Sequence, residues 1–105
     1  MDILKECMNM IAFSGEAKSL TLQAIKEARN GQFEQCNETL KKADKSLVKG
    51  HQAHTNLLVH EAQENDIQVS ILMMHSADHL NSAETIRILA NEIIAIHESK
   101  EVKHV

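Results

Sequence analysis

The segment IRILANEIIAI, residues 86–96, decides the fold of this chain. Its large apolar side chains recur at alternating steps of three and four residues, at Ile86, Leu89, Ile93 and Ile96. This spacing is typical of one face of a helix that packs against another helix. Further apolar residues widen that face, namely Ile88, Ala90, Ile94 and Ala95. A helix that is apolar over so wide an arc is usually buried on two sides. We therefore expect one side in the core of the protomer and the other in a subunit interface.

The same count, continued toward the N-terminus, leads into a polar cluster. The next positions in the stripe are Ser82, His79, His75 and Leu72. In a helix, Asp78 stands beside the two histidines, so two imidazoles and a carboxylate share one side. Polar groups in a packed seam cost stability unless they are paired, and such exceptions are expected where function overrides packing. This cluster is therefore the candidate functional site.

The rest of the chain also reads as helix, because it has no proline and three glycines. A first helix is expected from Asp2, a suitable N-cap, to about Arg29, with Asn30-Gly31 as a left-handed C-terminal turn. Ser14-Gly15 could mark a kink or a close helix approach in its middle.

A second helix is expected from about Gln32 to the polar cluster at residues 63–66. Its predicted seam consists of Phe33, Cys36, Leu40, Ala43, Leu47, Gly50, His54, Leu57 and Glu61. A third helix should run to about Ser99 and leave residues 100–105 as a frayed tail. Three long helices with short connections predict an all-α, antiparallel up-down-up bundle. A chain of 105 residues has room for one domain, spanning residues 1–105, and its modest core makes self-association favourable.

Composition excludes several classes of function. The formal net charge is -4 and no basic stripe exists, which argues against nucleic acid as a partner. With two Phe, no Trp and no Tyr, the chain has little aromatic surface for stacking bases or lining a ligand pocket. Cys7 and Cys36 lie on apolar helical stripes and are expected to be buried thiols. The N-terminus does not resemble a signal peptide and no apolar run could span a membrane, so we expect a cytoplasmic protein.

Residue chemistry leaves three readings of the cluster open. His75 and His79 could be buried imidazoles with a purely structural role. They could chelate a transition metal of the zinc type with Asp78, and His54 would then be the best third ligand, although no Glu follows the first His as it does in metalloprotease helices. His75 could also accept a phosphoryl group, because neutral imidazole is an abundant nucleophile near its pKa of about 6.5.

Four segments resemble one bacterial family. MMHSADHL, residues 73–80, resembles the active-site segment of the lactose/cellobiose-type enzyme IIA proteins of the sugar phosphotransferase system. The resemblance extends to MIAFSGEA with Ser19, to ARNGQF, and to HQAHT, which begin at residues 10, 28 and 51. It covers nearly the whole chain.

The resemblance implies a homotrimer of three-helix protomers that acts as a phosphotransferase component. His75 would be the phosphorylated nucleophile, His79 would orient it or stabilise the phosphoryl group, and Asp78 would bind a structural divalent cation, Mg²⁺ or similar, at the trimer axis. The phosphate would come from the phosphocarrier protein HPr and pass to a cysteine of the cognate enzyme IIB, for uptake of a β-disaccharide of the cellobiose, chitobiose or lactose class. Contact with the membrane would be indirect, through the transporter complex.

Two positions depart from the family segment, which usually reads His-x-Gln-Asp-His-Leu-Met. Ala77 replaces the Gln and Asn81 replaces the Met, so another amide, from Asn81 or Gln68, would have to supply what the Gln contributes. Two other classes compete with this reading. One is a non-enzymatic helical oligomer with a structural or metal-binding cluster. The other is a histidine phosphotransfer domain, which normally carries Lys and Gly soon after its His, and Ser76-Ala77-Asp78 has neither.

Overall fold

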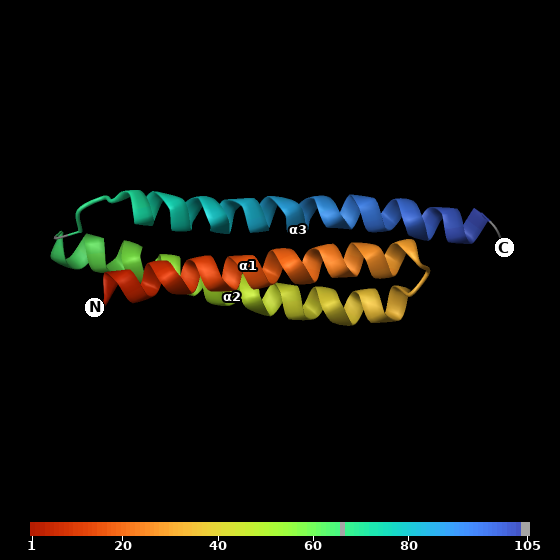
Figure 1. The fold of residues 1–105 in the computed structure, drawn as a ribbon, viewed down its shortest axis with the longest axis horizontal. Coiled ribbons are helices and arrows are strands. Elements are labelled where there is room, and N and C mark those ends of the chain that lie inside the picture. Colours follow the sequence, from red (N-terminus) through yellow and green to blue (C-terminus); the bar gives the residue numbers. More distant parts are fainter. Residues whose placement is uncertain (66, 104–105) are drawn as a thin grey trace.

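The computed structural model describes residues 1–65 and 67–103, with side chains up to residue 101. Three helices, α1 (Ile3–Arg29), α2 (Phe33–Glu64) and α3 (Ile71–Lys103), form a rod with extents of 60 × 19 × 17 Å (Figure 1). Because the chain reverses at each connection, α1 and α3 run parallel and α2 runs antiparallel to both. The predicted all-α, up-down-up fold is confirmed.

The helix ends follow local sequence. Asp2 Oδ1 accepts a hydrogen bond from the Lys5 backbone N–H at 3.0 Å, so Asp2 is the expected N-cap. Gly31 has φ +77° and turns the chain out of α1, as Asn65, with φ 50°, does after α2. The predicted end of the second helix is thus confirmed, although Asp66 lies outside the described residues.

The third helix is longer than its sequence predicted. It continues to Lys103, so the expectation of a frayed tail from Lys100 is wrong for residues 100–103. The physical reason is that no glycine or proline follows Ser99 to stop the helix, and Lys and Glu are good helix formers. Residues 104 and 105 lie outside the described part of the chain.

Small side chains at alternating steps of three and four fill the centre of the protomer. On α1 the buried residues are Cys7, Met10, Ser14, Ala17, Thr21, Ala24 and Ala28. On α2 they are Cys36, Thr39, Ala43, Ser46, Gly50, Ala53 and Leu57. Small residues let helix backbones approach closely and pack densely. Helix α1 packs along both neighbours, whereas α2 and α3 contact each other much less. Both cysteines are buried free thiols, as predicted.

The predicted seam of α2 is only partly right. Cys36, Ala43, Gly50 and Leu57 are buried as expected, but Glu61 is exposed. The alternate core positions are Thr39, Ser46 and Ala53, while Leu40, Leu47 and His54 are half-buried beside them. The line nearest α1 takes the small residues, and the larger side chains flank it.

Helix α3 carries two stripes one residue apart. The inner stripe packs on the protomer and comprises Ser76, Leu80, Ala83, Arg87, Ala90, Ile94 and His97, of which Arg87 and His97 are half-buried. The stripe predicted as a packed seam lies beside it and faces outward: Leu89, Ile93 and Ile96 are 54%, 38% and 56% exposed. Within the protomer the predicted seam is therefore not the core of α3.

The close helix approach occurs at a different glycine from the expected one. Helix α1 is unbroken through Ser14-Gly15, and a Cβ at Gly15 would have no protein atom within 4 Å. A Cβ at Gly50 would lie 3.0 Å from Leu80 Cδ1. The absent side chain of Gly50 thus makes room for α3, where the contact between α2 and α3 is tight.

Candidate functional site

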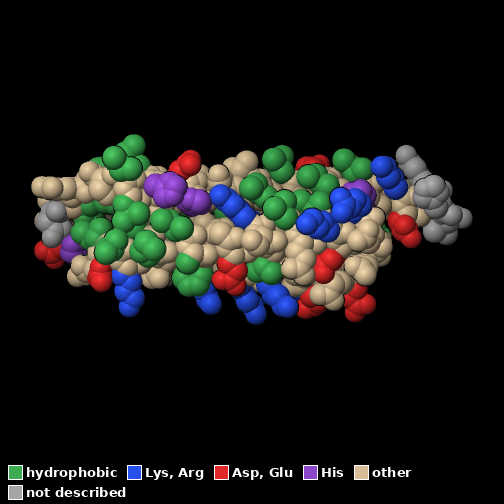
Figure 2. Space-filling view, viewed as in Figure 1, with side chains coloured by type: hydrophobic (Ala, Val, Ile, Leu, Met, Phe, Trp, Pro, Cys, Tyr) green, Lys and Arg blue, Asp and Glu red, His purple; other side chains and the backbone are tan. Residues whose placement is uncertain are grey.

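The site is built on the second and third turns of α3, with one side chain from α1. His75 is exposed and His79 is half-buried, and their Nε2 atoms lie 3.1 Å apart. The ring centroids are 4.4 Å apart with an interplanar angle of 85°, an edge-to-face arrangement. The i, i+4 spacing on one helix places the rings in this contact. Figure 2 shows the histidine group on α3 with hydrophobic side chains to its left and a basic side chain directly to its right.

Lys18 of α1 contacts the His79 ring on the side away from His75. Its Nζ lies 3.5 Å from His79 Nδ1, so the second imidazole stands between a cation and the first imidazole. Burial lowers the pKa of His79, and the charges of Lys18 and His75 lower it further, while Asp78 opposes them. His79 is therefore held neutral over a wider pH range than a free histidine.

The predicted cluster is assembled only in part. Asp78 is exposed, on the same side of α3 as Leu89 and Ile96, because whole numbers of helical turns separate these positions. Polar contact therefore joins His75 to His79 and leaves Asp78 at the edge of the outward stripe.

The zinc-type alternative does not fit this arrangement. His54, its proposed third ligand, is half-buried on α2. In the part of the chain that the structure describes, no three His, Cys, Asp or Glu side chains are grouped to hold a metal ion. A metal site of this kind within one protomer is therefore not supported.

The structure also contains an apolar groove. It has a volume of about 180 Å³ and lies between α2 and the N-terminal part of α3. Its walls include His54, Leu58, Val69, Met74 and Ala77. Leu58, Val69 and Met74 are 54%, 73% and 63% exposed, so the groove opens onto an apolar surface, and neither His75 nor His79 is among its lining residues.

Lys18 is a residue of the site that the sequence did not predict. A signal was present: Lys18 follows Ala17, a small residue in the same periodic stripe as Met10 and Ser14. What the sequence did not supply was the parallel register of α1 and α3, which brings Lys18 level with His79. The amides proposed from sequence do not take this place, because among residues 1–65 and 67–101 neither Asn81 nor Gln68 hydrogen-bonds to either imidazole.

Comparison with known proteins assigns the family. The family model described as "PTS system, Lactose/Cellobiose specific IIA subunit" matches residues 5–98. The chain belongs to this family. The family resemblance predicted from the sequence is confirmed.

Individual IIA proteins agree in sequence and structure. The chain is 34% identical over 89 residues to a lactose-specific EIIA component from Streptococcus mutans, a match that covers 85% of this chain and 86% of the relative. It is 36% identical over 93 residues to a cellobiose-specific EIIA component from Lactococcus lactis, covering 89% and 80%. The crystal structure of the cellobiose-specific enzyme IIA from Bacillus anthracis superposes with a TM-score of 0.93 at 29% identity, covering 98% and 94% of the two chains.

Membership of the IIA family makes this protein a component of a sugar phosphotransferase system and supports a role as a phosphoryl carrier. Within residues 1–65 and 67–103, no helix is both long and apolar enough to cross a bilayer.

Proposed function

We propose that this IIA protein carries a phosphoryl group on His75. It accepts the group from the phosphocarrier protein HPr and passes it to a cysteine of its cognate enzyme IIB, for uptake of a β-disaccharide of the cellobiose, chitobiose or lactose class. The observation that carries the proposal is the pairing of an exposed imidazole with a second, half-buried neutral one at 3.1 Å, in a chain of the IIA family.

The chemistry is two in-line displacements at phosphorus. In the first, the free ring nitrogen of His75 attacks the phosphoryl group of the donor phosphohistidine, so that one N–P bond forms as the other breaks. In the second, a thiolate attacks the phosphorus, an S–P bond forms, and His75 leaves as neutral imidazole. Such transfers depend mainly on positioning and on stabilising the charge of the phosphoryl oxygens. The Nε2 atom of His79 lies 3.1 Å from His75 Nε2, so an N–H at that position can donate a hydrogen bond to the phosphoryl oxygens.

Exposure of His75 suits transfer between proteins, because both partners must bring their reacting atoms to the same nitrogen. The apolar groove between α2 and the N-terminal part of α3 offers a small docking surface in the same part of the molecule, which matches the need for partners that bind and leave quickly. The scarcity of aromatic side chains fits a carrier that never binds the sugar itself.

The outward stripe of α3 supports a homotrimer. Leu89, Ile93 and Ile96 are large, apolar and exposed along one line, and a second and third copy of the chain would bury them. In such an assembly α3 is innermost, and the two-sided burial predicted from its sequence is completed.

Asp78 would then lie near the three-fold axis as one of three carboxylates. Like charges at close range repel each other, and a divalent cation relieves the repulsion. Carboxylate oxygens completed by water suit Mg²⁺ or a similar hard ion. The exposed Asp78 at the edge of the outward stripe fits this placement. The cation would be structural, since transfer between histidine and cysteine needs no metal at the axis.

Incubation with phosphoenolpyruvate and the two general phosphotransferase proteins tests the function. Intact-mass measurement should show one added phosphate, labile to acid and stable to base, and none on His75→Ala. His79→Ala should accept phosphate more slowly, and His51→Ala, at an exposed histidine of α2, serves as the matched control on the neighbouring helix. A wild-type protein that takes up no phosphate would favour the rival, a helical oligomer whose cluster is structural. An active His75→Ala beside an inactive His79→Ala would mean that the two roles are reversed.

A further inference from the structure

The three nitrogen-bearing side chains of the site form a row of contacts that runs from α1 to α3. Lys18 Nζ lies 3.5 Å from His79 Nδ1, and His79 Nε2 lies 3.1 Å from His75 Nε2. The two imidazoles alone could share their hydrogens in either order, because each neutral ring has one donor and one acceptor nitrogen. Lys18 removes this freedom, because an ammonium group has three donors and no acceptor.

The ring nitrogen that carries the hydrogen in each imidazole then follows from the Lys18 end of this row. His79 Nδ1 faces a cation, so it must present its lone pair and its hydrogen must sit on Nε2. His79 Nε2–H donates to His75 Nε2, which must therefore hold a lone pair, with the hydrogen of His75 on Nδ1. At 3.5 Å the first contact is long for a hydrogen bond, so the positive charge of Lys18 acts as well, by disfavouring a proton on the nitrogen that faces it.

We propose that Lys18 is a positioning residue for phosphoryl transfer, which acts through His79 to keep the Nε2 atom of His75 unprotonated and nucleophilic. This inference rests on the proposed function, since it assigns Lys18 to the same reaction at His75. A free neutral histidine in water prefers the opposite tautomer, with its hydrogen on Nε2, and that hydrogen would occupy the reacting position. The lysine thus reverses the ordinary tautomer preference of His75 through one intervening side chain, that of His79.

The same row of contacts is compatible with the phosphorylated state of His75. When phosphorus bonds to His75 Nε2, the lone pair that accepted from His79 is consumed. Phosphorus takes the position beside His75 Nε2 that the His79 Nε2–H occupied, so the two rings must move apart to admit it, and that N–H can then donate to a phosphoryl oxygen. Lys18 still fixes His79 in that tautomer, so the donor remains available in both states without a ring flip.

Three variants test the assignment. Lys18→Met keeps a long side chain but removes the cation, Lys18→Arg keeps the cation and its donors, and Lys26→Met removes another lysine of α1 as the matched control. The tautomers are read from ¹⁵N chemical shifts and two-bond proton couplings of both imidazoles at about pH 8.5, where ordinary histidines are neutral. The rate of phosphate uptake from phosphorylated HPr is measured on the same samples.

In the wild type we expect His75 with its hydrogen on Nδ1 and His79 with its hydrogen on Nε2. Lys18→Met should shift His75 toward the Nε2–H form and slow phosphate uptake by about tenfold or more, a range typical of residues that orient a reacting group. Uptake should still end at one phosphate per chain. Lys18→Arg should restore both the tautomer and most of the rate, and Lys26→Met should change neither.

A fall in rate with unchanged tautomers would overturn the proposal, because Lys18 would then act on the partner or on the phosphoryl group directly. Unchanged rates in Lys18→Met would overturn it as well, whatever the tautomers. Failure of the proposed function looks different: wild-type protein would take up no phosphate at all, while the wild-type tautomers would still report whether Lys18 orders the two rings.

Discussion

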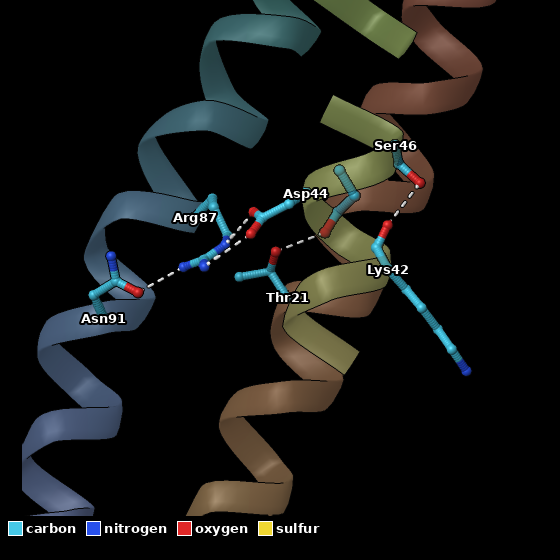
Figure 3. A network of polar contacts seen from close by, with 7 residues as sticks. Thr21, Lys42, Asp44, Ser46, Arg87 and Asn91 are labelled. Carbon is cyan, nitrogen blue, oxygen red and sulfur yellow. Dashed lines mark hydrogen bonds and ion pairs between the residues drawn. The ribbon is translucent and has the colours of Figure 1, made fainter. Parts of the chain in front are cut away.

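Arg87 of α3 donates hydrogen bonds to the Asp44 carboxylate of α2 through two of its nitrogens. Its Nε donates to Asp44 Oδ1 at 2.7 Å and its Nη2 to Oδ2 at 3.3 Å, while its Nη1 donates to Asn91 at 2.6 Å (Figure 3). The Arg87 side chain is only 16% exposed, whereas Asp44 is 52% exposed. Because α2 and α3 contact each other little elsewhere, this bidentate pair is a principal polar tie between them.

Replacing Arg87 by Lys should weaken that tie without removing the charge. A lysine keeps one donor toward Asp44 but loses the planar fork, so we expect the free energy of unfolding to fall by about 0.5–1 kcal/mol, a modest loss because Asp44 is half in solvent. Urea unfolding of Arg87→Lys, Asp44→Asn and the double variant measures the coupling. Purely additive effects of the single changes would show that the two side chains do not interact.

The two mid-helix glycines should respond oppositely to alanine. Gly15→Ala adds a methyl group where no atom lies within 4 Å, so it should stabilise the protein by about 0.5–1 kcal/mol through helix propensity. Gly50→Ala should gain less or lose stability, because its Cβ would press on Leu80, which is buried. Urea midpoints at matched protein concentration compare them. A larger gain at Gly50 than at Gly15 would contradict the packing at this crossing.

A charge on the outward stripe should break the assembly. Ile93→Glu places a carboxylate in the proposed apolar interface, where it has no partner. Sedimentation should give about three times the 11.8 kDa chain mass for the wild type and a smaller species for the variant. The control is Val48→Glu, since Val48 is an exposed apolar residue of α2, and that variant should remain assembled. A wild type that stays monomeric on concentration would remove the basis for the trimer.

We expect Asp78 to make the stability of the trimer depend on a divalent cation. Asp78→Asn removes the mutual repulsion of three carboxylates, so it should hold the trimer together without metal, whereas a chelator should loosen the wild-type trimer. Glu34→Gln, at an exposed acid on α2, is the matched control. If elemental analysis finds no metal and neither chelator nor Asp78→Asn changes trimer stability, the axial cation is ruled out.

Cys36 should be a poor nucleophile in the folded protein. Burial raises the pKa of its thiol, the carboxylates of Glu27 and Glu98 raise it further, and Arg87 opposes them. As pH rises, the thiol of the unfolded protein ionises before that of the folded protein. The stabilising contribution of Cys36 is therefore fully present below about pH 8.5 and is lost as pH rises through the pKa of the folded state. Urea midpoints between neutral and alkaline pH should therefore fall more for wild type than for Cys36→Ala. Rapid alkylation of native Cys36 at pH 8 would contradict this.

Much of the molecule followed from the sequence alone. The absence of proline, the N-cap at Asp2 and the turn at Gly31 determined three long helices, because these signals act within a few residues of the chain. The spacing of His75 and His79 on one helix likewise determined that their rings meet, since neighbours at i and i+4 lie one turn apart.

Only the tertiary structure decided which stripe of α3 is the core and which residue completes the site. The outward stripe, with Leu89 and Ile93, and the inner stripe, with Ala83 and Ala90, have the same period, so periodicity could not rank them. Close approach to α1 selects the small residues, Ala83 and Ala90, and leaves Leu89 and Ile93 outside. Lys18 reaches His79 because α1 and α3 run parallel in one register. That register is a property of packing between helices, and no local pattern in the sequence encodes it.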